Sequence, residues 1–191
     1  MILADRWASI EEIVAAHQPL RLDLGCGYVK PAGYVGLDDL RGVGGLQGQL
    51  PSVEGGPDVL LDLNEDAYPF ADGSVEEIRS RHFLEHSHLD HVFEQSHRLL
   101  RPGGLFVGIV PYANSADGMS PGHHVFLTER FFERNPSFGQ KFQITRITYR
   151  QSEEWEAWPR LLRKLIPYDW ARTHLFNVCK EMRVEAVRRS G

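Results

Sequence analysis

The stretch Leu22-Asp23-Leu24-Gly25-Cys26-Gly27, followed by Val35-Gly36-Leu37-Asp38-Asp39, decides the fold of this chain. It predicts a buried strand, a glycine turn and a second strand that ends in carboxylates. The glycines would let the backbone approach a ligand, because no Cβ stands in the way. An acid at the tip of the second strand can accept hydrogen bonds from two ribose hydroxyls. The pattern therefore predicts a site for a nucleotide-like ligand.

The spacing of the glycines argues against a dinucleotide. A dinucleotide fingerprint requires a third glycine three residues after Gly27, where this chain has Lys30. A G-x-G pair alone also fits an ordinary turn. An NAD-dependent oxidoreductase is therefore disfavoured, and the ligand prediction depends on the segments that follow.

Further segments come in a fixed order: Leu60-Leu61-Asp62-Leu63-Asn64, Pro69 to Ile78, His82-Phe83-Leu84-Glu85-His86 and Arg98-Leu99-Leu100-Arg101-Pro102-Gly103-Gly104. With the first motif, they resemble the class I S-adenosylmethionine-dependent methyltransferases. More narrowly, the chain resembles small bacterial methyltransferases linked to surface-polysaccharide biosynthesis. The resemblance runs from about Leu20 to Ile147. The resemblance is specific because two motifs, L-D-L-G-C-G and L-L-R-P-G-G, occur together in this order and at this separation.

Apolar runs alternate with helical patterns over the first two thirds of the chain. Strands are expected over 20–24, 34–37, 59–63, 77–80 and 105–110, and helices over 9–16 and 89–100. Strands that are apolar throughout are typical of a parallel sheet covered on both faces. The resemblance adds an antiparallel pair of C-terminal strands. The predicted fold is α/β, doubly wound and Rossmann-like, with a mostly parallel seven-stranded sheet and an antiparallel C-terminal edge.

The 191 residues are expected to form a single domain. Its predicted parts are an N-terminal helix (1–19), a cofactor-binding core (20–150), a helical insert (151–180) and a last strand (181–191). The insert is too long for a simple connection, so we interpret it as a small helical cap over the acceptor site. A helix is expected over Thr173 to Met182, and residues 41–56, which are rich in glycine, are interpreted as a mobile loop.

The first crossover is shortened. Only residues 28–33 separate Gly27 from the second strand, whereas a parallel crossover normally needs about a dozen residues. A tight loop must therefore replace the usual helix, which weakens any role for a helix N-terminus in holding a cofactor carboxylate. Lys30 is one alternative source of positive charge, and it fits equally well as a solvated lysine.

The net charge and the cysteine content indicate which binding partners and which cellular compartment to expect. The formal net charge of −5 argues against a broad nucleic-acid footprint, which needs clustered Lys and Arg. Cys26 and Cys179 provide no disulfide framework, and no secretory signal or membrane span is apparent. We therefore expect a cytoplasmic protein, and the family resemblance implies a small-molecule or glycan acceptor. The sequence does not predict the oligomeric state.

The resemblance implies S-adenosylmethionine as the cofactor and places the first strand and its turn beside it. Gly25, Cys26 and Gly27 would approach its methionine and ribose parts. Asp23 would lie near its amino group, although a carboxylate there also fits a role in bracing the turn.

The next two strands would supply the contacts to ribose and adenine. Asp38 is the first choice for the ribose hydroxyls, and Asp39 is its rival, because a strand boundary cannot be placed within one residue. Asp62 and Leu63 would meet the adenine edge. Asp62 alternatively fits a helix N-cap.

Histidines follow the fourth strand and offer two kinds of chemistry. His82 lies where ligands of open α/β sheets bind, so it is a candidate to orient the cofactor or to act as a base. The neighbouring His86, His88 and His91 raise the alternative of a zinc site. No acid or cysteine pattern completes a known ligand set, so no metal is predicted.

A second pair of histidines follows the fifth strand. The resemblance implies a histidine shortly before an aromatic residue and a threonine, and the spacing favours His124 over His123. Either would be the general base toward the acceptor, and either also fits a loop histidine bonded to the backbone. Tyr112 and Asn114, just past the strand, are candidates to line the same pocket.

Aromatic and basic residues gather in the insert. Trp155, Trp158, Tyr168 and Trp170 fit a small core under the cap better than a platform for sugar rings. Arg160, Arg163 and Lys164 border an apolar run that also fits a membrane surface, but the run is short.

Two functions from different classes remain. The leading hypothesis is a methyltransferase acting on a small-molecule or glycan-linked acceptor. The alternative is a non-catalytic cofactor-binding or scaffold module that keeps the fold, since fold alone does not establish activity. The shortened glycine turn is the feature that favours the alternative.

Overall fold

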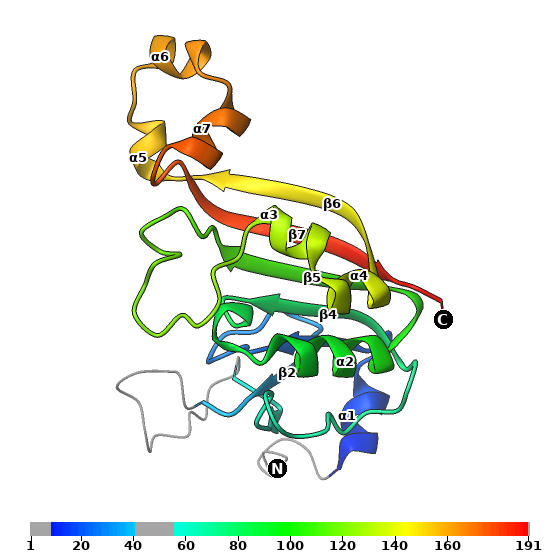
Figure 1. Cartoon of the computed structure of the whole chain (residues 1–191). Coiled ribbons are helices and arrows are strands. Elements are labelled where there is room, and N and C mark those ends of the chain that lie inside the picture. Colours follow the sequence, from blue (N-terminus) through cyan, green and yellow to red (C-terminus); the bar gives the residue numbers. More distant parts are fainter. Residues whose placement is uncertain (1–8, 41–55, 191) are drawn as a thin grey trace.

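The computed structural model describes residues 9–40 and 56–190. Seven strands form one sheet in the order β3-β2-β1-β4-β5-β7-β6, drawn in Figure 1. The strands are β1 (Arg21–Leu24), β2 (Val35–Asp38), β3 (Val59–Leu60), β4 (Val75–Arg81), β5 (Leu100–Pro111), β6 (Phe142–Gln151) and β7 (Cys179–Arg188). Strands β1 to β5 pair in parallel, and β7 runs antiparallel to both β5 and β6. The predicted mostly parallel sheet with an antiparallel C-terminal edge is confirmed.

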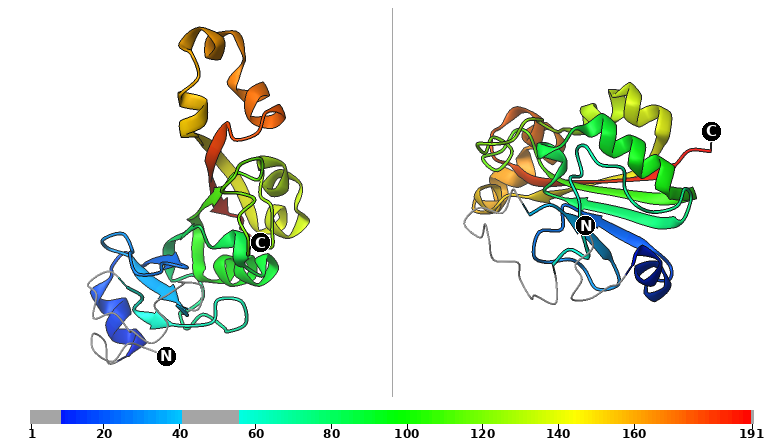
Figure 2. Two further views of the ribbon diagram at one scale, coloured as in Figure 1. Left: turned by 90° about the vertical axis from the view of Figure 1, so that its left-hand side faces the viewer. Right: turned by 90° about the horizontal axis from the view of Figure 1, so that it is seen from below.

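Helices cover both faces of the sheet. In Figure 2, α1 (Ile10–Ala16) lies on one face, and α2 (Leu89–Leu99), α3 (Glu129–Arg134) and α4 (Pro136–Lys141) lie on the other. The main core includes a cluster of buried aromatic rings from α2, β5, α4 and β6: Phe93, Phe106, Phe138 and Phe142. Both faces are covered, and the apolar side chains Leu22, Leu37 and Ile78 of the central strands are fully buried. Strand β4 also carries charged residues, among them Glu77 and Arg79.

A helical arm, residues 152–178, connects β6 to β7. It contains α5 (Glu153–Glu156), α6 (Arg160–Leu165) and α7 (Tyr168–His174). The arm projects beyond the end of the sheet (Figures 1 and 2). Its own small core consists of Trp155, Ala171 and Val178, while Trp158 and Trp170 are exposed. Trp155 therefore packs in the core of the arm, as the sequence analysis favoured over stacking on a sugar ring.

The helix expected over Thr173 to Met182 is wrong. Helix α7 ends at His174, and β7 begins at Cys179. Pairing in the sheet explains the difference, because Cys179 lies opposite Gln151 and Met182 opposite Tyr149 on β6. Tertiary strand pairing overrides a local helical pattern.

The strand expected over 105–110 begins earlier than predicted. Pro102, Gly103 and Gly104 lie inside β5, which already begins at Leu100. The pairing of β4 with β5 shifts register at this point, and Gly103 has a φ of +72°. The three residues therefore form an irregularity within the strand, as glycine at a bulge often does. Helix α4 was not expected from the sequence.

The shortened first crossover is confirmed as a loop. Residues 28–33 contain turns, in which Val29 N donates to Cys26 O (3.2 Å) and Tyr34 N to Pro31 O (3.2 Å). Of the loop expected over 41–56, residues 41–55 lie outside the described residues. Among the helices described, none has the length and apolar character needed to cross a membrane.

Candidate cofactor site and active site

A cavity of about 670 Å³ opens at the carboxyl ends of β1, β2 and β4. In open α/β sheets, ligands bind in the crevice beyond these strand ends. The residues that line it are Gly25, Gly27, Asp38, Asp39, Asp62, Leu63, Asn64, Glu65, His82, Phe83, His86, His88, Pro121 and Gly122. The lining thus comes from loops that are far apart in the sequence.

The glycine turn after β1 is shaped by its neighbours. Gly25 has a φ of +67°, and a Cβ at this position would overlap the Phe83 side chain. Gly27, with a φ of +56°, faces open space. Its amide donates to Asp38 Oδ2 (2.7 Å). Only glycine fits Gly25, and the open side of Gly27 leaves room for a ligand.

Asp38 ends β2 and borders the cavity. Its Oδ2 accepts from Gly27 N, and its Oδ1 accepts from Leu40 N (2.6 Å). Burial raises the pKa of Asp38, while these backbone bonds act in the opposite direction. Each carboxylate oxygen can accept a second hydrogen bond. Asp38 therefore braces the turn and can still accept from a ligand hydroxyl, and Asp39 borders the same space.

Three predicted cofactor residues, Asp23, Cys26 and Lys30, are not among the residues that line the cavity. Asp23 is 1% exposed, and its Oδ1 lies 2.6 Å from Arg79 Nη1 on β4. Burial raises the pKa of Asp23 to about 6 despite this arginine. Lys30 pairs with the buried Asp58, and Cys26 is buried. Their positions indicate bracing of the turn, and their predicted contact with a cofactor stays a prediction.

Asp62 and Leu63 follow β3 and both line the cavity. Asp62 Oδ1 accepts from Asn64 N (3.0 Å), so it stabilises a turn, and no helix begins there. Sequence reasoning assigned no role to Asn64 and Glu65, although they directly follow this pair. Pro121 and Gly122 were also missed, because only their position after β5 points toward the cavity.

His82 is held between two carboxylates. It follows β4 with a φ of 54°, its Nδ1 lies 3.6 Å from Glu85 Oε1, and its Nε2 lies 2.6 Å from Glu181 Oε1. The carboxylates of Glu85 and Glu181 raise the pKa of His82, although burial opposes them. A protonated ring donates hydrogen bonds and cannot accept a proton. This environment favours an orienting role over that of a base.

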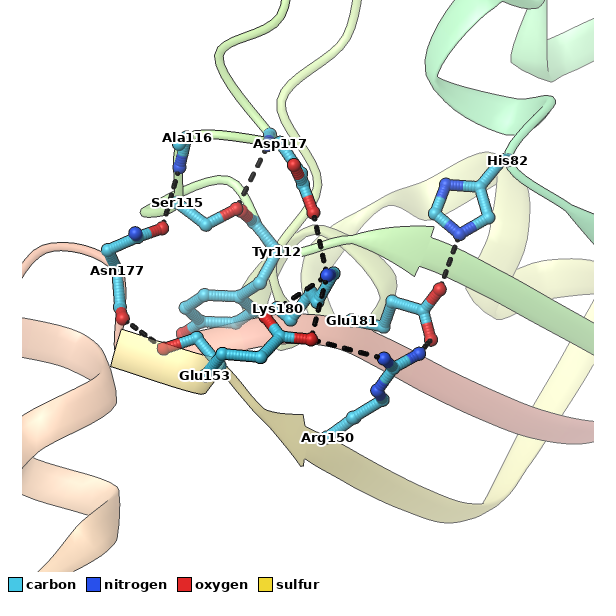
Figure 3. Close-up of polar contacts among 12 residues, drawn as sticks. His82, Tyr112, Ser115, Ala116, Asp117, Arg150, Glu153, Asn177, Lys180 and Glu181 are labelled. Atoms are coloured by element: carbon cyan, nitrogen blue, oxygen red, sulfur yellow. Dashed lines mark hydrogen bonds and ion pairs between the residues drawn. The ribbon is translucent and has the colours of Figure 1, made fainter. Parts of the chain in front are cut away.

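Glu181 links this histidine to the helical arm. Figure 3 shows its carboxylate between His82 and Arg150, with Arg150 Nη1 3.2 Å from Oε2. Arg150 also forms an ion pair with Glu153 of α5, with Nη2 3.6 Å from Oε1. The same oxygen of Glu153 accepts a hydrogen bond from Lys180 Nζ (3.0 Å). Burial alone would raise the pKa of Glu181, but hydrogen bonds from His82 and Arg81 hold it at about 2.

The two histidines after β5 differ in their surroundings. His123 Nδ1 lies 3.0 Å from Gly118 O, and its ring packs edge-on against that of His86, with centroids 4.7 Å apart. His124 is exposed, and its backbone amide donates to Glu85 O (2.8 Å). His123 is therefore the one in contact with a cavity-lining side chain. Which of them acts as a base stays a prediction.

Tyr112 and Asn114 lie at the base of the arm. Tyr112 Oη donates to Glu129 Oε2 (3.0 Å), and Arg172 Nη1 lies 2.7 Å from Glu129 Oε1. The Arg172 guanidinium also stands 3.9 Å from the centroid of the Tyr149 ring. Asn114 Nδ2 donates to Leu175 O (2.8 Å). These residues anchor the arm, and the described lining of the cavity comes from other residues.

Comparison with known proteins agrees with this geometry. Residues 22–108 match a family model described as a methyltransferase domain. A search of curated proteins gave no match. A SAM-dependent methyltransferase from Archaeoglobus fulgidus has a TM-score of 0.61 at 12% identity, covering 93% of this chain and 90% of that chain.

Two further solved structures have the same fold. Geranyl diphosphate C-methyltransferase from Streptomyces coelicolor A3(2), solved with Mg²⁺, geranyl-S-thiolodiphosphate and S-adenosyl-L-homocysteine, has a TM-score of 0.55 at 13% identity, covering 93% of this chain and 74% of that chain. A putative S-adenosylmethionine-dependent methyltransferase from Listeria monocytogenes has a TM-score of 0.55 at 14% identity, with 91% of each chain covered. At these identities, the solved structures show a shared fold. Residues 22–108 therefore match a methyltransferase domain, and the chain has a fold that solved S-adenosylmethionine-dependent methyltransferases share.

Proposed function

We propose that this protein transfers a methyl group from S-adenosylmethionine to a small-molecule or glycan-linked acceptor. The observation that carries the proposal is the cavity beyond β1, β2 and β4, which joins an open glycine turn to the carboxylates of Asp38 and Asp39. Carboxylates at this strand end suit the two hydroxyls of a ribose.

The residues present fit the cofactor. The cavity volume of about 670 Å³ lies within the range of about 300–1,000 Å³ that is usual for small-molecule sites. Gly27 leaves its side of the turn open, and Leu63 offers an apolar surface for a base. Gly25, Gly27, Asp38, Asp39, Asp62, Leu63 and His82 would hold the cofactor, which supplies an electrophilic methyl group on a sulfonium.

The contribution of the protein is to align the reactants and to remove a proton from a hydroxyl acceptor. Alignment of two bound reactants can lower a barrier by roughly 7–11 kcal/mol, and a general base adds about 10²–10⁴-fold. His82, between two carboxylates, would orient a bound group by donating a hydrogen bond. His123 or His124 would then act as the base.

The nature of the acceptor rests on sequence resemblance. The motifs resemble those of small methyltransferases linked to surface-polysaccharide biosynthesis, so we propose a hydroxyl on a glycan or a glycan precursor. A small molecule that is not a sugar is the wider alternative within the same proposal.

The proposal is tested by cofactor binding and methyl transfer. Calorimetric titration with S-adenosylhomocysteine should give saturable binding to the intact chain. Mass spectrometry of a cell extract supplied with cofactor should then reveal a compound that gains one methyl group. His124→Ala and His123→Ala, made separately, should keep binding, and the variant lacking the base should lose about 10²-fold or more in transfer rate. Full turnover by both variants would remove these histidines from the mechanism.

A non-catalytic module remains the second candidate. The shortened crossover favours it, as does Asp38, whose two oxygens already accept backbone amides. Cofactor binding without turnover on hydroxyl, amine or carboxyl acceptors would support this candidate over the enzyme.

A further inference from the structure

Three side chains of metal-ligating type meet beside the cavity. Glu85 and His86 belong to a one-turn 3₁₀ helix (Leu84–His86), and His123 lies in the loop after β5. One potential ligand atom of each lies within 4.8 Å of the others. The sequence predicted no metal because it weighed only histidines that are close along the chain. His123 reaches His86 only through the fold.

Glu85 is an unusual buried carboxylate. It is 2% exposed, and neither of its side-chain oxygens has a hydrogen-bond partner in the described part of the chain. His82 Nδ1 lies 3.6 Å from Oε1, which is an ion-pair distance. An ionised carboxylate without hydrogen bonds is costly to bury. A bound cation would give these two oxygens the close partner that the described residues do not provide.

The two histidines are oriented by the backbone. His86 Nδ1 lies 3.0 Å from Gly122 O, and His123 Nδ1 lies 3.0 Å from Gly118 O. A carbonyl oxygen only accepts, so in both rings Nδ1 carries the hydrogen. In the neutral ring, Nε2 then presents its lone pair. Fixing one ring nitrogen by a backbone carbonyl is how proteins commonly orient metal-ligating histidines.

We propose that Glu85, His86 and His123 bind one divalent transition-metal ion of the zinc type. Two histidines and one carboxylate form a ligand set used for catalytic zinc, which keeps a further position open. Ligand atoms around tetrahedral zinc lie roughly 3.4 Å apart, so the separations in the cluster must contract by up to about 1.4 Å. His86 is exposed, so its ring can shift together with Gly122, to which it is bonded.

The position of the site gives the ion a role. His86 and Gly122 also line the cavity, so the ion would stand at its edge. A metal at an open site lowers the pKa of a bound hydroxyl or water. Activation of an acceptor hydroxyl in this way rests on the proposed function, whereas metal binding itself does not. A metal-bound His123 cannot accept a proton, so His124 is then the candidate base.

The test uses the intact protein, stripped with a chelator and titrated with Co²⁺, a visible-absorbing substitute for Zn²⁺. We expect one equivalent to bind, with absorption that Zn²⁺ abolishes. His86→Ala, His123→Ala and Glu85→Gln should each weaken binding more than about tenfold. His124→Ala is the matched control from the same loop, and His174→Ala is a control from the arm; both should bind as the unsubstituted chain does.

Two outcomes overturn the site: no stoichiometric Co²⁺ binding by the unsubstituted chain, or equal affinity in every variant. Circular dichroism of each variant checks folding, and His123→Ala keeps the test valid if Glu85→Gln fails to fold. S-adenosylhomocysteine titrations on the same samples separate the two proposals. Metal binding without cofactor binding would contradict the proposed function and leave the metal site standing.

Discussion

The cavity and the helical arm are built on different physical principles. The cavity lies over β1, β2 and β4, whose inward residues Leu22, Leu37 and Ile78 are fully buried. The arm has a core of only three buried residues, and Leu161 and Leu165 are 70% and 71% exposed. Its attachment depends on polar contacts of Arg172. Hydrophobic packing therefore positions the site, and ionic contacts hold the arm.

The largest effect is expected at the glycine turn. Gly25→Ala places a Cβ in overlap with Phe83 at a positive φ, so overpacking and backbone strain should together cost about 4 kcal/mol. Urea denaturation measures the loss, and binding of S-adenosylhomocysteine should disappear. Gly33→Ala is the matched control, since its φ is +80° but its Cβ would meet open space. Equal losses in both variants would contradict the role of Phe83.

Removal of the arm's anchor should be the next largest effect. Arg172→Met leaves Glu129 without the guanidinium that lies 2.7 Å away, at a cost of about 3 kcal/mol. Hydrogen exchange should increase over residues 152–178, while cofactor binding persists. Lys164→Met, at an exposed position of α6, is the control. Loss of cofactor binding in Arg172→Met would show that Arg172 does more than anchor the arm.

Acid should weaken the link between the two regions. The folded-state pKa of Glu181 is about 2, below the ordinary 4.5, because the bonds from His82 and Arg81 outweigh its burial. Its stabilising contribution is therefore complete above pH 4.5 and is lost as pH falls toward 2. When the pH falls from 4.5 to 2, the free energy of unfolding should decrease less in Glu181→Gln than in the unsubstituted chain. The difference between the two decreases should be on the order of 2 kcal/mol. Chemical denaturation at each pH measures these free energies. The same pH dependence in both proteins would contradict a stabilising role for ionised Glu181.

The smallest effect is expected on the outer face of the arm. Leu161→Ser and Leu165→Ser alter exposed side chains, so each should change the unfolding free energy by less than about 0.5 kcal/mol. The matched core variant Trp155→Ala should cost about 3–5 kcal/mol. Thermal unfolding followed by tryptophan fluorescence compares them. A large loss from either leucine variant would mean that this face is covered in solution.

The sequence predicted the order of the first five strands, although not the start of β5, because the signals there are local. The apolar run at Leu22 to Leu24, the glycines and the acids at Asp38 and Asp39 each mark a strand or its end. The β7 boundary was missed because Cys179 is placed by pairing with Gln151, far back in the chain. A local sequence pattern cannot predict pairing between strands that are distant in the sequence.

The site was less predictable than the fold for the same reason. Asp23 and Lys30 pair with Arg79 and Asp58, which are distant in sequence. His123 lies against His86 because two loops converge at one sheet edge. Roles that depend on distant partners require the three-dimensional structure.

The central claim is that the adenosine of the cofactor lies at the carboxyl ends of β1 and β2. A crystal structure with S-adenosylhomocysteine tests it most directly. We predict ribose hydroxyls within hydrogen-bond distance of Asp38 or Asp39 and the adenine beside Leu63. Adenosine bound elsewhere, or a cavity closed by side chains in a liganded crystal, would contradict the account.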